Sequence, residues 1–170
     1  MNIRLEKPED IEGIRHVTHE AFDHRAAEVK LVDLLRERCE LTLSLVVEEN
    51  GEIVGHVAFS PMNIDSAPAS FKALGLGPLS VLPAHQRKGI GSALMREGLA
   101  QCAALDHDAV LLLGHIAYYP RFGFQPASAF GISSDYDAGD AFMALPLRAG
   151  ALNDVHGKAH YVRAFADCDC

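Results

Sequence analysis

The stretch LSVLPAHQRKGIGSALM, residues 79–95, constrains the fold more than any other part of the chain. Strand-forming apolar residues come before a proline, two cations and two spaced glycines, and a helix-forming run follows. We predict a strand from Phe71 to Leu82 and a helix from about Gln86 to Leu105. The buried stripe of this helix is expected to contain Ile90, Leu94, Gly98, Cys102 and Leu105. The chain is therefore organised around a strand-to-helix junction.

Gly89 and Gly91 lie in the first turn of this expected helix, where each glycine costs about 0.5–1 kcal/mol relative to alanine. One explanation is close approach of a ligand, because the N–H groups of Arg87 to Ser92 could point at a phosphate. Arg87 and Lys88 would add positive charge at the same place. The other explanation is that Gly91 lets the helix pack tightly on a strand. Two known phosphate motifs are excluded, since GxGxxG needs a glycine at Leu94 and a Walker loop needs Gly-Lys-Ser/Thr at residues 88–90.

The remaining periodicities predict a single domain with the element order β-α-α-β-β-β-α-β-α-β-β. The dipeptide Asn50-Gly51 has the residues of a tight hairpin turn between two strands. Pro78 interrupts the strand before the junction and predicts a bulge or local splaying near Gly75–Pro78. The other expected elements are strands at 2–6, 41–47, 52–60, 109–114, 124–132 and 141–147, helices at about 8–22 and 26–38, and a short helix near Tyr118.

Composition limits the classes of partner. The formal charge of −8 disfavours nucleic acid, because binding to a phosphate backbone depends on Lys and Arg. The first ten residues are unlike a signal peptide, and the longest apolar run is far below the roughly 20 residues of a membrane span. We therefore expect a cytoplasmic protein with no membrane partner. The oligomeric state is left open, a homodimer being one arrangement that the sequence allows.

Two motifs carry a family resemblance. The pattern Gln86-x-x-Gly89-x-Gly91 resembles the Q/R-x-x-G-x-G/A pyrophosphate loop of the GCN5-related N-acetyltransferase (GNAT) superfamily. The segment AYYPRFGF, residues 117–124, is similar to the A-x-F-Y-x-x-x-GF segment that follows the fifth strand in that family. Within the family, LGPLSV and YYPRFGF look most like a group of small bacterial acetyltransferases. The resemblance covers residues 1–147, and residues 148–170 would be an extension that packs on this domain or on a partner.

The resemblance implies an α/β (α+β) fold, with a mixed central sheet whose strands four and five splay apart and about four flanking helices. It also implies acetyl-CoA as the co-substrate, an amine acceptor and no metal. Backbone groups of the fourth strand would pair with the pantetheine arm, and the following loop would hold the pyrophosphate. The residues implied to bind the cofactor are Leu79, Ser80, Val81, Gln86, Arg87, Lys88, Gly89, Ile90, Gly91, Ser92 and Tyr119.

For the chemistry, the resemblance implies direct attack of an amine on the bound thioester, with Tyr119 protonating the departing thiolate. A phenol is a reasonable proton donor to a thiolate if its hydroxyl lies within hydrogen-bond distance. Many relatives have a glutamate on the fourth strand as the base, but residues 74–81 contain no acid. His56 and His115 are the candidate bases, directly or through water, and Glu28 is a weaker candidate.

Two function classes remain open: an N-acetyltransferase acting on a small molecule or a peptide or protein amine, and a non-catalytic acyl-CoA-binding sensor. Retention of Tyr119 beside the loop favours the enzyme, and the absence of the strand glutamate favours the sensor. A tRNA-acetylating toxin is disfavoured by the acidic charge. His16, His19, Glu20, Asp23 and His24 form a polar cluster without the HExxH order, and we expect a solvated helix face there rather than a metal site.

Overall fold

The computed structural model describes residues 1–169. Within these residues, nine strands form a mixed sheet with the path β1-β2-β3-β4-β5-β8-β6, while β9 pairs with both β3 and β7. The strands are β1 Asn2–Leu5, β2 Leu43–Glu49, β3 Glu52–Ile64, β4 Ala73–Val81, β5 Ala109–Leu113, β6 Gln125–Pro126, β7 Ile132–Ser134, β8 Phe142–Pro146 and β9 Gly157–Tyr161. The α-helices are α1 Ile11–Ala21, α2 Ala27–Glu37, α3 Ile90–Ala104 and α4 Ala164–Asp167. A mixed sheet with four α-helices among the described residues confirms the predicted class.

The chain divides into two compact units, which we describe separately. Unit 1 contains residues 1–60, residues 77–98 and the described residues from Val162 onward, and unit 2 contains residues 61–76 and 99–161. The long strands β3 and β4 and the helix α3 contribute residues to both units.

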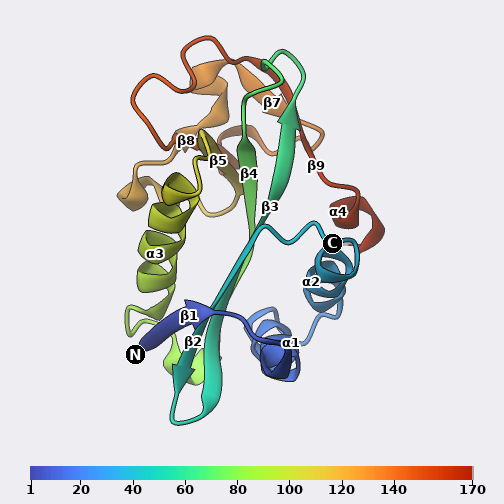
Figure 1. The fold of residues 1–170 in the computed structure, drawn as a ribbon, viewed down its shortest axis with the longest axis vertical. Coiled ribbons are helices and arrows are strands. Elements are labelled where there is room, and N and C mark those ends of the chain that lie inside the picture. Colours follow the sequence, from blue (N-terminus) through green and yellow to red (C-terminus); the bar gives the residue numbers. More distant parts are fainter. Residues whose placement is uncertain (170) are drawn as a thin grey trace. The chain divides into compact units, whose positions relative to one another are not determined.

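In unit 1, β2 pairs antiparallel with β1 and with β3 (Figure 1). Asn50 and Gly51 join β2 to β3 with φ angles of 52° and 82°. Left-handed backbone at both central residues is what a type I′ hairpin turn requires, and Asn-Gly tolerates it best. The predicted hairpin is therefore confirmed.

Helix α3 packs closely on β3 in unit 1 because two glycines remove side chains from the contact. A Cβ on Gly55 would lie 2.8 Å from Cγ2 of Ile90, and a Cβ on Gly98 would lie 2.7 Å from the Phe59 ring. The helix begins at Ile90 and not at Gln86, because residues 83–85 form a 3₁₀ turn and the loop after it has left-handed residues. The predicted burial of Leu105 is wrong: its side chain is 51% exposed, beyond the last helical residue.

Unit 1 also contains α1 and α2, which lie against each other, and α4 beside α2 (Figure 1). Leu31 and Leu35 of α2 form a small apolar cluster with Ala164 and Cys168 at the C-terminal end. Sequence reasoning proposed no helix there. Four residues carry too little periodicity to predict one, and this helix is stabilised by its contact with α2.

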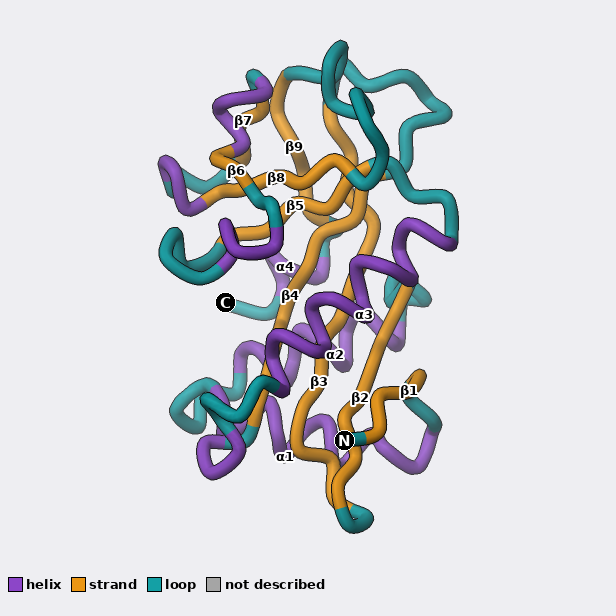
Figure 2. The backbone as a smooth tube through the Cα atoms, turned by 90° about the vertical axis from the view of Figure 1, so that its left-hand side faces the viewer, coloured by secondary structure: helices purple, strands orange, loops and turns teal. Residues whose placement is uncertain are grey.

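In unit 2, β4 and β5 are parallel, and β5 pairs antiparallel with β8. The strands β5 and β8 lie side by side in Figure 2. The β4–β5 ladder consists of Ala73–Ala109, Leu74–Val110 and Gly75–Leu111, so it ends at the start of the segment where Pro78 predicted an interruption. The core of this unit is apolar and includes Leu111, Phe142, Leu152 and Val155.

The predicted strand at 124–132 is wrong for most of its length. Only Gln125–Pro126 and Ile132–Ser134 are extended, and a 3₁₀ helix at Ala127–Phe130 lies between them. Sequence reasoning also missed β9, which pairs with Met62–Ile64 of β3 and with β7. The domain boundary after Leu147 stays a prediction.

Among the described residues, no helix has both the length and the apolar character that crossing a bilayer requires.

His160 joins three segments of unit 2. Its Nδ1 lies 2.9 Å from Oδ2 of Asp135, and its Nε2 lies 2.9 Å from Oδ1 of Asp65. The hydrogen bond to Asp135, together with that to Asp65, raises the pKa of His160 above its ordinary value of 6.5. Because the folded state binds this proton more tightly than the unfolded chain, the stabilisation is complete below pH 6.5 and is lost as pH rises through the folded pKa.

We therefore expect His160→Gln to lower the free energy of unfolding more at about pH 5.5 than at about pH 8.5. Urea denaturation of both proteins at the two pH values measures this difference. Lys158, which lies 3.3 Å from Asp135, is unchanged in the variant. An equal loss at both pH values would contradict the assignment.

Candidate active site

The loop between β4 and α3 lies in unit 1 and has an unusual backbone. After the 3₁₀ turn at Pro83–His85, the Gln86 side chain turns back and its Nε2 donates a hydrogen bond to the Val81 carbonyl at 3.0 Å. Arg87 and Gly89 then take φ angles of 59° and 88°. Gln86, Arg87, Lys88 and Gly89 are all exposed, so this hydrogen bond and the turn hold the loop in shape at the surface.

Among the described residues, the N–H groups that follow Gln86 in this loop have no hydrogen-bond acceptor. Across the part of the chain that the structure describes, neither a backbone nor a side-chain acceptor bonds the N–H groups of residues 87–92, and the first bonded one is that of Ala93, which donates to the Gly89 carbonyl at 2.9 Å. A Cβ on Gly89 would meet no atom within 4 Å, so the space beside the loop is open. Free N–H groups at a helix N-terminus favour an anion.

The end of β4 leads into this loop. Ser80 is fully buried, and its hydroxyl donates to the buried Thr18 Oγ1 of α1 at 3.4 Å. Leu79 and Val81, whose side chains are on the opposite side of the strand from Ser80, are half-buried. Ser80 is therefore an anchor of β4 onto α1, and only its backbone groups remain for a ligand.

Tyr119 lies in unit 2, at the start of the 3₁₀ helix Tyr119–Phe122 that follows β5. The N–H groups of Tyr118 and Tyr119 both donate to the His115 carbonyl, at 3.0 and 3.4 Å. The Tyr119 ring packs edge-on against Tyr118 and Phe124. Burial raises the pKa of Tyr119 to about 12, so the phenol keeps its proton throughout the physiological range.

Gly114 is a residue of this site that sequence reasoning missed. A Cβ at Gly114 would lie 2.3 Å from Cε2 of Tyr119, so any other residue would displace the ring. Its only signal in the sequence is its position at the end of the apolar run AVLLLG. The neighbouring Tyr118 stacks under the Arg121 guanidinium, 4.5 Å from its ring centre, which is a packing role.

The three candidate bases lie in different environments. His56 is fully buried in unit 1, and its Nε2 lies 2.8 Å from the Ser44 hydroxyl. The same hydroxyl donates a hydrogen bond to Glu6, and Glu6 forms an ion pair with Arg36. Burial lowers the pKa of His56 to about 4, so its ring is neutral at physiological pH. His115 is exposed in unit 2 just after β5, and Glu28 of α2 pairs with Arg25 at 2.7 Å. The partly buried Ser44–Glu6–Arg36 network was not predicted, because its members come from three separate segments.

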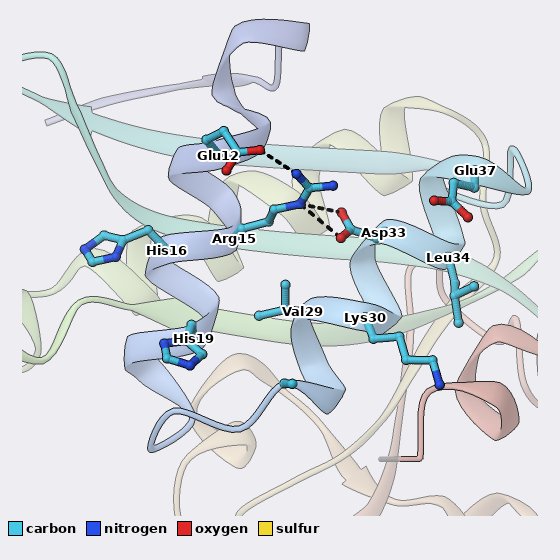
Figure 3. A pocket seen from close by; sticks show the side chains of 10 residues that line it. Glu12, Arg15, His16, His19, Val29, Lys30, Asp33, Leu34 and Glu37 are labelled. Carbon is cyan, nitrogen blue, oxygen red and sulfur yellow. Dashed lines mark hydrogen bonds and ion pairs between the residues drawn. The ribbon is translucent and has the colours of Figure 1, made fainter.

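A cavity of about 600 Å³ lies between α1 and α2 in unit 1 (Figure 3). Arg15 of α1 reaches across it to Asp33 of α2 at 3.0 Å and also bonds Glu12. Lys30 and Glu37 line the α2 side, so the cavity offers both signs of charge on a partly apolar wall.

Comparison with known proteins agrees with both sequence motifs. Residues 2–127 match the family model described as the acetyltransferase (GNAT) domain. The chain is 35% identical over 167 residues to the uncharacterized N-acetyltransferase YhbS of Escherichia coli K12, and the match covers 97% of this chain and 98% of that protein. It is also 33% identical over 120 residues to the uncharacterized N-acetyltransferase YjhQ of the same organism, covering 70% of this chain and 66% of that protein.

Solved structures give the same family. The YhbS structure from E. coli in complex with CoA has a TM-score of 0.91 at 35% identity, and the match covers 97% of this chain and 91% of that one. A GNAT-family acetyltransferase from Brucella melitensis, in complex with acetyl-CoA, has a TM-score of 0.79 at 41% identity, covering 96% and 97%. The chain therefore belongs to the GNAT family of acetyltransferases.

Proposed function

We propose that the protein is an acetyl-CoA-dependent N-acetyltransferase that moves an acetyl group directly from the thioester to an amine. The observation that carries this proposal is the row of N–H groups at residues 87–92 that find no acceptor among residues 1–169, at a helix N-terminus beside an open surface. The complexes of the YhbS and Brucella relatives with CoA and acetyl-CoA support the same ligand for this chain.

In this proposal the N–H groups of Arg87 to Ser92 bind the two phosphates of the pyrophosphate. Arg87 and Lys88 add positive charge, and Gln86 holds the loop through its hydrogen bond to Val81. Backbone groups of Leu79 to Val81 pair with the amides of the pantetheine arm as an added strand would. Ser80 contributes no side-chain contact, because its hydroxyl is buried against Thr18.

The amine nitrogen attacks the thioester carbonyl carbon, the C–S bond breaks, and the acceptor leaves as an amide. A backbone N–H of β4 stabilises the oxyanion that develops on the carbonyl oxygen. Tyr119 donates its proton to the sulfur as the thiolate departs, and solvent restores it. Since its pKa of about 12 keeps the phenol protonated, the donor is ready at any physiological pH.

The proton of the attacking amine passes to water or to His115. His115 lies just after β5, on the segment whose carbonyl orders Tyr118 and Tyr119, which supports a role near the thioester. The environment of His56 supports a different role: it is neutral, fully buried and bonded to Ser44, so it helps to hold β2 and β3 in position.

A sensor that binds acyl-CoA without turnover is the second candidate, and the absence of an acid in residues 74–81 is what favours it. Two measurements separate it from the enzyme. Calorimetric titration with CoA tests binding, and release of free CoA from acetyl-CoA across a panel of small-molecule and peptide amines tests turnover. Binding together with amine-dependent CoA release supports the enzyme. Binding without release on any amine supports the sensor, and no binding contradicts both.

A further inference from the structure

The C-terminal end of α1 brings three metal-binding side chains together, none of which belongs to the candidate active site. The backbone reverses after the helix because Asp23 and His24 adopt left-handed φ angles of 52° and 63°. The His24 N–H then donates to the His19 carbonyl at 2.9 Å, the bond that closes a Schellman motif. In this motif the second residue beyond the helix C-cap packs against a residue in the last turn of the helix, and this contact is normally apolar. Here the two residues are His24 and His19.

The donor atoms of this cluster face one another. Nδ1 of His24 lies 3.4 Å from Nδ1 of His19 and 3.1 Å from Oε1 of Glu20, and Nδ1 of His19 lies 3.5 Å from the same oxygen. For metal–ligand bonds of about 2.05 Å, two corners of a tetrahedron are about 3.3 Å apart. The three observed separations therefore fit one face of a tetrahedral site, with the fourth corner free for water.

We propose that His19, Glu20 and His24 form a binding site for a borderline divalent transition ion, with zinc the best match. Two imidazoles and one carboxylate are a ligand set that zinc and its neighbours accept. The negative end of the α1 dipole lies at the same place and favours a cation. The sequence alone favoured a solvated helix face, because residues 16–24 lack the HExxH spacing. In the structure, the left-handed turn after α1 brings His24 next to His19 as the second histidine of the cluster.

The proposed ion would be held by residues outside the candidate active site. It would link the last turn of α1 to the connection into α2, and His19 also lines the cavity between these helices (Figure 3). Binding to the folded state alone raises stability as ligand concentration increases, so the melting temperature should rise when the ion is added.

Titration of the full chain with Co²⁺, followed by its visible absorption and by calorimetry, tests the proposal. We expect one Co²⁺ per chain. Its visible ligand-field bands should be those of an ion with a low coordination number, and no thiolate charge-transfer band should be present. His24→Ala and Glu20→Gln should each weaken binding by roughly tenfold or more. Both side chains lie at the surface, at 65% and 31% exposure, so the variants should fold.

His16→Ala is the matched control, because His16 is an exposed histidine one turn earlier on α1 and is outside the cluster. Binding that is kept in His16→Ala and lost in the other two variants supports the site. Absence of Co²⁺ binding, a thiolate band, or equal binding by the wild type and His24→Ala would overturn it.

Discussion

Replacing Tyr119 with Phe is expected to lower the rate of CoA release from acetyl-CoA by about tenfold or more, with little change in the affinity for CoA. The substitution removes only the hydroxyl oxygen, so the edge-on packing against Tyr118 and Phe124 is kept. The thiolate would then leave without a positioned proton donor. Release of free thiol in steady state and a calorimetric titration with CoA measure the two quantities.

Tyr118→Phe is the matched control for this experiment. The two tyrosines are adjacent and their N–H groups bond the same carbonyl, but Tyr118 packs under Arg121. We expect this variant to keep nearly full activity. Equal losses in the two variants would show that the effect is structural, and an unchanged rate in Tyr119→Phe would remove Tyr119 from the mechanism.

Replacing Gly89 with Ala is expected to weaken CoA binding by about tenfold, which corresponds to about 1.4 kcal/mol. A residue with a Cβ is strained by about 1–2 kcal/mol in the left-handed conformation. Gly89 adopts that conformation at φ 88°, and relief of the strain would turn the neighbouring N–H groups away from the direction that the pyrophosphate needs. The new methyl group would also occupy the open space beside the loop.

Gly51→Ala separates this effect from a general loss of stability. Gly51 has a φ of 82° and, like Gly89, would place a Cβ with no other atom within 4 Å of it, but it lies in the β2–β3 turn. Both variants should lose similar thermal stability, and only Gly89→Ala should lose affinity for CoA. Similar affinity in the two variants would contradict the pyrophosphate assignment.

Together the two experiments separate the proposed functions. A variant of the loop affects binding in an enzyme and in a sensor, whereas a variant of Tyr119 affects only an enzyme.

Local patterns predicted much of unit 1. Asn50-Gly51 predicted its hairpin because few residue pairs tolerate two left-handed conformations in a row. Gly89 was correctly singled out as a glycine that needs an explanation. Its conformation differs in detail from the expectation, since it precedes α3 with a left-handed φ and does not lie within the first turn.

Predictions failed where structure depends on distant partners. Residues 124–132 have the apolar composition of a strand. They are extended only near the two ends of the segment, where the backbone pairs with β8 and with β9. Strand β9 forms because its backbone groups pair with β3 and with β7. Short segments of this kind have no periodicity long enough to predict them.

The candidate site divides in the same way. The sequence by itself identified the family, and it singled out the loop at residues 86–92 and Tyr119 as candidate site residues, because these depend on glycines and on residues at fixed spacing along the chain. Only the tertiary structure decided that His56 is buried and neutral, that Gly114 makes room for Tyr119, and that His24 faces His19. Burial and close contact depend on residues that are distant in the sequence, and chain reversal depends on backbone angles. The pattern of residues along the chain specifies neither of these.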